Sequence, residues 1–171
     1  MCAGPRIAAL ALLLLIGGCA ADSESPSNGN TPDRLGVYVP DPGTTIIQSE
    51  QSSLHAPTFA VVVDTGTWRS IWTQTWAEDN SVPVLPFEDF VLTSVFVLGL
   101  GDRTGRGYAV NIDSLVTYTS GQILFATEFK PVPPCPGPEV ITAPVHMVRV
   151  PNHPPLMEHR ISVVPRHCPP L

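Results

Sequence analysis

The chain has 171 residues, of which 9 are basic and 15 acidic, giving a net charge of −6 at neutral pH. This acidic balance argues against binding nucleic acid or an anionic membrane surface through charge. The length suits one domain with a short tail.

The first segment, "MCAGPRIAALALLLLIGGC", is typical of an export signal. One arginine precedes the apolar run Ile7 to Ile16, which is shorter than the roughly 20 residues that span a bilayer but fits a secretory signal. Its end, Ile16-Gly17-Gly18-Cys19, resembles the lipobox of bacterial lipoproteins. The resemblance implies that residues 1–18 are removed and that Cys19 carries the lipid. The alternative is a plain signal peptide cut nearby, with Cys19 incidental.

Residues 19–34 follow as a predicted tether. The stretch "AADSESPSNGNTPD" is small, polar and rich in turn formers, so it buries too little apolar surface to offset the entropy of ordering. As a random coil it reaches about 20 Å. Removing residues 1–18 takes away one arginine and no acid, which leaves a net charge of −7. Residues 35–171 are expected to form a single β-rich domain.

The early part of this domain predicts two strands and a helix. "RLGVYVP" and "TFAVVVDTG" have strand character, whereas "TTIIQSEQSSLHAP" is expected to be mostly irregular. Trp68, Ile71, Trp72 and Trp76 then recur with helical spacing on one face, and Asp64, Thr65 or Thr67 could cap the helix. This face is either an aromatic platform for a sugar or peptide or a surface packed on a sheet. We favour packing.

The remaining elements are strands. "FVLTSVFVLGL", "GYAVNIDSLVTYT", "QILFATEFK", "PVHMVRV" and "EHRISVVP" all have strand patterns, with a bulge expected near Ser114. The fold class is therefore mainly β or α+β. We predict an antiparallel sheet or sandwich of six or more short strands, with one Trp-rich helix packed on it.

The glycine-rich stretch "LGLGDRTGRGY" is not a phosphate-binding loop. It lacks the third glycine of a dinucleotide loop and the lysine of a Walker loop, and a strand rather than a helix follows it. We interpret it as a hairpin loop whose glycines permit positive φ. Arg103, Arg106 and Tyr108 form a candidate partner-contact loop. The alternative is that the arginines are only solvated.

An ordered series of motifs resembles the C-terminal domain of the PrcB-like family. Its members are accessory lipoproteins named for stabilising a surface protease complex. The series contains Asp89-Phe90, Gly99, Thr104-Gly105, Gly107-Tyr108 and Pro144, and it covers about residues 60–163. Arg106 departs from the family pattern because it splits a pair of glycines. The resemblance implies a non-catalytic accessory or binding role outside the cytoplasm.

Two further cysteines are consistent with export. An exported domain with Cys135 and Cys168 to spare is expected to pair them in a disulfide. The alternative is two free thiols. The bridge would pin a C-terminal third that holds 12 of the 20 prolines and is therefore expected to form edges and loops.

Catalytic, metal and cofactor motifs are not evident. The five histidines include no H-E-x-x-H pair, so neither a metal nor a cofactor is expected. Asp64-Thr65-Gly66 resembles the tripeptide of aspartic proteases, whose chemistry needs two carboxylates. A dimeric envelope peptidase using Asp64 therefore remains an alternative, although a helix cap explains this residue more simply.

These observations predict a lipid-anchored, non-catalytic accessory protein of the bacterial cell envelope. Its partner would be an exported protein, with a protease as one candidate, held at sheet edges or at the arginine loop by strand addition. The membrane would be contacted only through the lipid, and Ala20 after Cys19 favours the outer membrane. Besides the peptidase, a structural envelope protein without a fixed partner remains possible.

Overall fold

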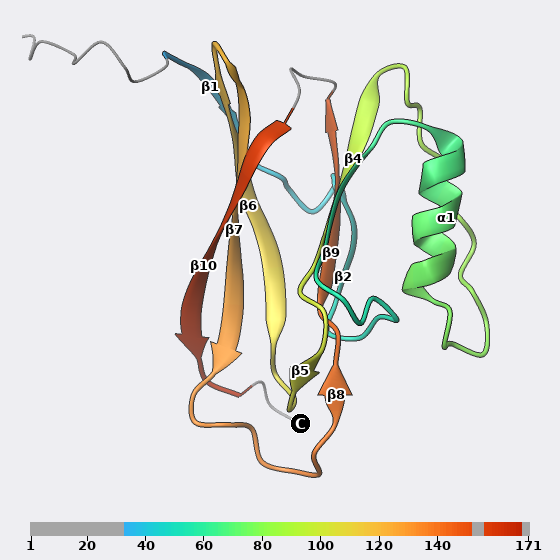
Figure 1. Cartoon of the computed structure of the whole chain (residues 1–171), viewed down its shortest axis with the longest axis vertical. Helices are drawn as coiled ribbons and strands as arrows, with labels where there is room; N and C mark the ends of the chain where they lie inside the picture. Colours follow the sequence, from blue (N-terminus) through green and yellow to red (C-terminus); the bar gives the residue numbers. More distant parts are fainter. Residues whose placement is uncertain (1–32, 152–155, 169–171) are drawn as a thin grey trace, which may run out of the picture. The chain divides into compact units, whose positions relative to one another are not determined.

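The computed structural model describes residues 33–151 and 156–168. Figure 1 shows two facing layers of strands, with the helix on the outer side of one of them. The elements in chain order are β1 (Arg34–Tyr38), β2 (Thr45–Ser49), β3 (Thr58–Val62), α1 (Thr65–Thr75), β4 (Thr93–Gly99), β5 (Arg103–Thr104), β6 (Ala109–Tyr118), β7 (Gly121–Pro131), β8 (Ile141–Thr142), β9 (Val145–Pro151) and β10 (Leu156–Arg166).

The strands form a sandwich. One sheet has the order β1-β6-β7-β10 and the other the order β2-β9-β4-β3, while β5 and β8 pair separately. The predicted mainly-β architecture with one Trp-rich helix is confirmed. One pairing differs from the antiparallel expectation, because β10 lies parallel to β7. The chain crosses after β7 to the opposite sheet and returns along β9, so β10 starts at the end where β7 starts.

The glycine-rich connection is not a hairpin, which corrects the sequence interpretation. β4 and β6 lie in different sheets, so residues 99–107 carry the chain across the sandwich, with β5 pairing to β8 on the way. The expected positive φ is present at Gly101, Gly105 and Gly107, with values of 74°, 112° and 88°. A Cβ on Gly101 would lie 2.7 Å from the backbone nitrogen of Pro57, so this position accepts only glycine.

The structure also tests two other local predictions, the bulge in β6 and the irregular stretch before β3. The predicted bulge is present, because the β6–β7 register shifts between Ile112 and Ser114. The stretch expected to be mostly irregular contains β2, which pairs with β9 at the edge of its sheet. β2 is only five residues long and its side chains are partly buried, so its alternation is too short to predict a strand from sequence.

The helix is fixed at its start and along its buried face. The Asp64 carboxylate accepts hydrogen bonds from the Thr67 amide at 2.9 Å and the Thr67 hydroxyl at 2.7 Å, as an N-cap does. The indoles of Trp68 and Trp72 are buried and donate to the carbonyls of Pro86 and Pro83. The packing interpretation of the tryptophans is therefore confirmed for these two.

Two apolar cores hold the layers together. The core between the sheets includes Phe96, Leu98, Ile112, Leu115 and Leu124. The second lies between α1 and its sheet and includes Val62, Trp68, Trp72, Val95 and Met147. Burial of large side chains on both faces of β4 explains its nearly continuous apolar sequence.

The C-terminal end is covalently fixed. Cys135, in the loop after β7, forms a disulfide with Cys168, just after β10, as the sequence predicts. The predicted lipid-bearing Cys19 and the signal sequence lie outside the described residues. Within the described part of the chain, no helix has the length and apolar character needed to cross a bilayer.

Candidate functional site: a cleft between two sheet edges

The sandwich is closed along one flank, where β2 and β9 meet the first half of β6. There the Gln48 side chain donates to the Val110 carbonyl at 2.9 Å, and the Ile112 amide donates to Nδ1 of His146 at 2.8 Å. Nε2 of His146 lies 3.3 Å from the Thr45 hydroxyl. We call this the closed flank, since polar side chains of one sheet satisfy the backbone of the other.

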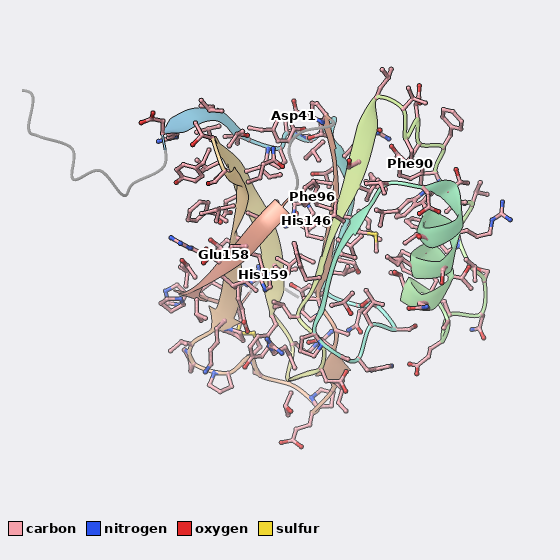
Figure 2. The ribbon with its side chains drawn as sticks, turned by 45° about the horizontal axis from the view of Figure 1, so that its top comes forward. Asp41, Phe90, Phe96, His146, Glu158 and His159 are labelled. Atoms are coloured by element: carbon pink, nitrogen blue, oxygen red, sulfur yellow. A yellow bond between two sulfur atoms is a disulfide. The ribbon has the colours of Figure 1, made fainter. Side chains whose placement is uncertain are left out.

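His146 is the central residue of the closed flank. Figure 2 labels it in the region between the two sheets, and its side chain is almost fully buried. This burial lowers the pKa of His146 to about 4, although the nearby Asp113 carboxylate acts in the opposite direction. The imidazole is therefore neutral at physiological pH, which lets Nδ1 accept the Ile112 hydrogen bond beside the bulge.

The opposite flank, between β3 and β10, is open. These two strands are the outermost members of their sheets. The Phe59 ring stacks on the His159 ring with centroids 4.3 Å apart, but further along β10 the side chains of Ile161 and Val163 are 38% and 58% exposed. We call this region the open flank.

A cleft of about 390 Å³ lies along the open flank. Its lining combines the end of β4 with both edge strands and two charged side chains: Pro57, Thr58, Phe59, Leu98, Gly99, Leu100, Arg103, Glu128, His159, Ile161 and Val163. The lining is mainly apolar with a few polar groups, which is the usual composition of a binding site.

The polar side of the cleft is an ion pair. Nε and Nη2 of Arg103 donate to the two carboxylate oxygens of Glu128 at 2.9 and 3.2 Å, and Nη1 donates to the Leu100 carbonyl at 2.9 Å. The hydrogen bonds to Glu128 raise the pKa of Arg103. Both side chains are mostly buried, so the pair is a fixed polar feature of the cleft.

The three residues of the predicted contact loop are therefore not equivalent. Arg103 lines the cleft but is already bonded to Glu128, Arg106 is exposed, and Tyr108 is half-buried. The guanidinium of Arg106 lies along Gly137 in the Pro-rich loop. The structure thus makes Arg103 part of a cleft wall rather than a free charge on a hairpin. A partner contact at Arg106 or Tyr108 stays a prediction.

The described titratable side chains also bear on the peptidase alternative. Asp64 is exposed, and its hydrogen bonds from Thr67 lower its pKa, as expected for a helix cap. Among the described histidines, His55 bonds two carboxylates: its Nδ1 lies 2.7 Å from Asp102 and its Nε2 lies 3.0 Å from Glu78. These contacts, chiefly the one with Asp102, raise the pKa of His55. Because carboxylates occupy both ring nitrogens, neither is available to activate a nucleophile.

A second hollow lies on the closed flank and is less suited to a ligand. Its volume is about 450 Å³, and its lining includes Asn111, Asp113 and His146. The Asp113 carboxylate already accepts hydrogen bonds from Asn111 and Thr127, both at 2.7 Å. Among residues 33–151 and 156–168, no three His, Cys, Asp or Glu side chains are grouped to hold a metal ion.

Comparison with protein families finds a similarity in the central part of the chain. Residues 94–151 match the family described as PrcB C-terminal. This PrcB-like segment covers β4 to β9, so the resemblance seen in the sequence is confirmed there. Searches of curated proteins and of solved structures give no match.

The PrcB-like segment supplies only part of the cleft. Leu98, Leu100, Arg103 and Glu128 lie inside it, whereas Phe59 and the residues of β10 lie outside. Of the cleft residues, the sequence indicates Arg103 as a contact residue but not Glu128, Phe59, His159, Ile161 or Val163. The alternation of apolar side chains in "HRISVV" was a usable signal, but nothing in the sequence placed β10 opposite β3.

Proposed function

We propose that the protein is a lipid-anchored accessory protein of the bacterial envelope that holds an exported polypeptide at the open flank. The observation that carries this proposal is the cleft between β3 and β10, where both sheets end and apolar side chains remain exposed. The PrcB-like segment supports an accessory role, with a protease complex as the first partner to test.

Strand addition explains how the open flank would bind. β10 is 11 residues long and pairs with β7 along one edge, while among the described residues no strand lies beyond its other edge. A partner strand added there would gain backbone hydrogen bonds. Because His159, Ile161 and Val163 point into the cleft from alternate positions, the partner's alternate side chains would cover them.

The proposed cellular location follows from the export signal. The lipobox-like sequence before Cys19 supports an acylated mature N-terminus, and Ala20 favours the outer membrane. A disulfide between Cys135 and Cys168 suits an oxidising compartment outside the cytoplasm. The accessory protein would then act where an exported partner is present, without contacting nucleic acid.

The test is capture of partners from solubilised envelopes with matched variants. Ile161→Asp combined with Val163→Asp places two carboxylates in the cleft, while the control Val37→Asp places one carboxylate on β1, where Val37 is also exposed. We expect a discrete exported protein to co-purify with the wild type and with Val37→Asp but not with the cleft variant.

Two outcomes would contradict the proposal. Wild-type protein that captures nothing above background removes the partner, and equal capture by all three proteins moves the contact away from the open flank. Asp64→Asn is a further control. We expect it to retain partner capture, whereas a peptidase that used Asp64 would lose its activity.

A further inference from the structure

The connection between α1 and β4 carries protruding apolar side chains. Val84, Phe87, Val91 and Leu92 are 92%, 86%, 83% and 66% exposed. Scattered apolar residues on a surface need no explanation, but several large ones gathered on a short segment mark a contact site. We call Phe87, Val91 and Leu92 the apolar tip.

Two acidic residues lie next to the apolar tip: Glu88 points inward, and the exposed Asp89 bonds to the segment itself. The Glu88 carboxylate is fully buried and accepts two hydrogen bonds of 2.5 Å from the Arg149 guanidinium. The Asp89 carboxylate accepts the Val91 amide at 3.0 Å, and its carbonyl accepts the amides of Leu92 and Thr93. For Glu88 and its apolar neighbours this is the reverse of the usual arrangement, in which carboxylates are exposed and apolar side chains are buried. Burying a carboxylate costs desolvation free energy, and exposing apolar side chains brings no stabilisation in return.

The hydrogen bonds of Glu88 and Asp89 also fix the shape of the tip. Behind it, the indoles of Trp68 and Trp72 hold the carbonyls of Pro86 and Pro83, both at 2.9 Å. The apolar side chains are therefore presented from a firmly attached segment and do not depend on a flexible loop. A rigid support lowers the ordering cost of any contact that they make.

The position of the tip relates it to the N-terminus of the domain. Figure 1 shows the start of β1, at Arg34, and the start of β4, just after the tip, at the same end of the domain. The chain that precedes Arg34 thus joins the domain at the end that carries the tip. With a lipid on Cys19, a tether of about 20 Å would keep this end near the membrane.

We propose that the apolar tip inserts into the interfacial region of the lipid bilayer that holds the anchor. This inference rests on the lipid anchor of the proposed function. The domain is acidic, so electrostatic attraction to anionic lipids cannot hold it and the contact must be apolar. Three side chains are too few to bind a membrane firmly alone, but the tether supplies a high local concentration. The tip then sets the orientation of the domain on the membrane.

The test adds one tryptophan at the tip itself, Phe87→Trp, to every protein compared (the wild type below carries only this change), because Trp68 and Trp72 are buried. The chain from Cys19 onward, which retains every described residue, is coupled through the Cys19 thiol to a maleimide lipid in phosphatidylcholine vesicles. Half of the preparations carry brominated acyl chains, which quench tryptophan emission only at short range. We expect brominated vesicles to quench the wild type, and the double variant Val91→Asp/Leu92→Asp to lose this quenching. Ile141→Asp, at an exposed apolar position on β8 outside the open flank, should retain it.

Either of two results would overturn the inference. Wild-type emission that is the same in both kinds of vesicle means that the tip does not meet lipid. Equal quenching of the wild type and the double variant means that another surface does. Should the double variant instead lose a co-purifying protein without any change in quenching, the tip binds protein and the lipid inference is wrong. Because the thiol coupling replaces acylation, failure here leaves the accessory proposal standing.

Discussion

The two flanks of the sandwich differ in the contacts that join the two sheets. On the closed flank, His146 and Gln48 hydrogen-bond the backbone of Ile112 and Val110 in the opposite sheet. On the open flank, the sheets are bridged by the Phe59–His159 stack, and the adjoining cleft leaves Ile161 and Val163 exposed. The difference suggests that one flank provides stability and the other is left for binding.

The pH dependence of stability should report on the closed flank. Burial lowers the pKa of His146 to about 4, whereas an unfolded histidine titrates near 6.5, so between these values the unfolded chain binds more protons. The stabilisation is complete above about pH 6.5 and is lost as the pH falls towards 4, by up to about 3 kcal/mol. Urea unfolding at a series of pH values measures this loss. His146→Gln, which does not titrate, should lack this part of the slope, and an unchanged slope would contradict the assignment.

Substituting one histidine on each flank, His146 or His159, should show at a fixed pH that the closed flank contributes more to the free energy of unfolding than the open flank. His146→Leu leaves the buried Ile112 amide without its acceptor, which should lower the free energy of unfolding by about 2 kcal/mol. His159→Leu on the open flank keeps an apolar contact with Phe59 and should change the free energy by less than about 0.5 kcal/mol. Urea unfolding near pH 7.5 provides both values. Equal losses would show that the flanks do not differ in stability.

The substitution with the smallest expected effect on stability lies in the cleft, where the expected effect on partner binding is large. Val163→Asp alters an exposed side chain on an edge strand, so the free energy of unfolding should change by less than about 0.5 kcal/mol. Thermal unfolding followed by circular dichroism checks this. A large loss of stability would mean that the open flank is part of the core and that loss of partner capture in such variants has a trivial cause.

The sequence predicts local structure better than it predicts which strands meet. The helix and the bulge follow from the spacing of the tryptophans and from the change of face near Ser114. The glycine-rich connection was misread as a hairpin because its residues do not encode that β4 and β6 join different sheets. For the same reason, the sequence predicts only part of the cleft. Arg103 is conspicuous in the sequence, but Glu128 and His159 reach the cleft only through long-range pairing.

The most direct test of the open flank is site-specific photocrosslinking in living cells. A photoreactive residue at position 163 lies on the cleft, and the same residue at position 37 is an exposed control on β1. Our account predicts a crosslink from position 163 to a discrete exported protein and no such product from position 37. No product from position 163, or the same product from both positions, would contradict it.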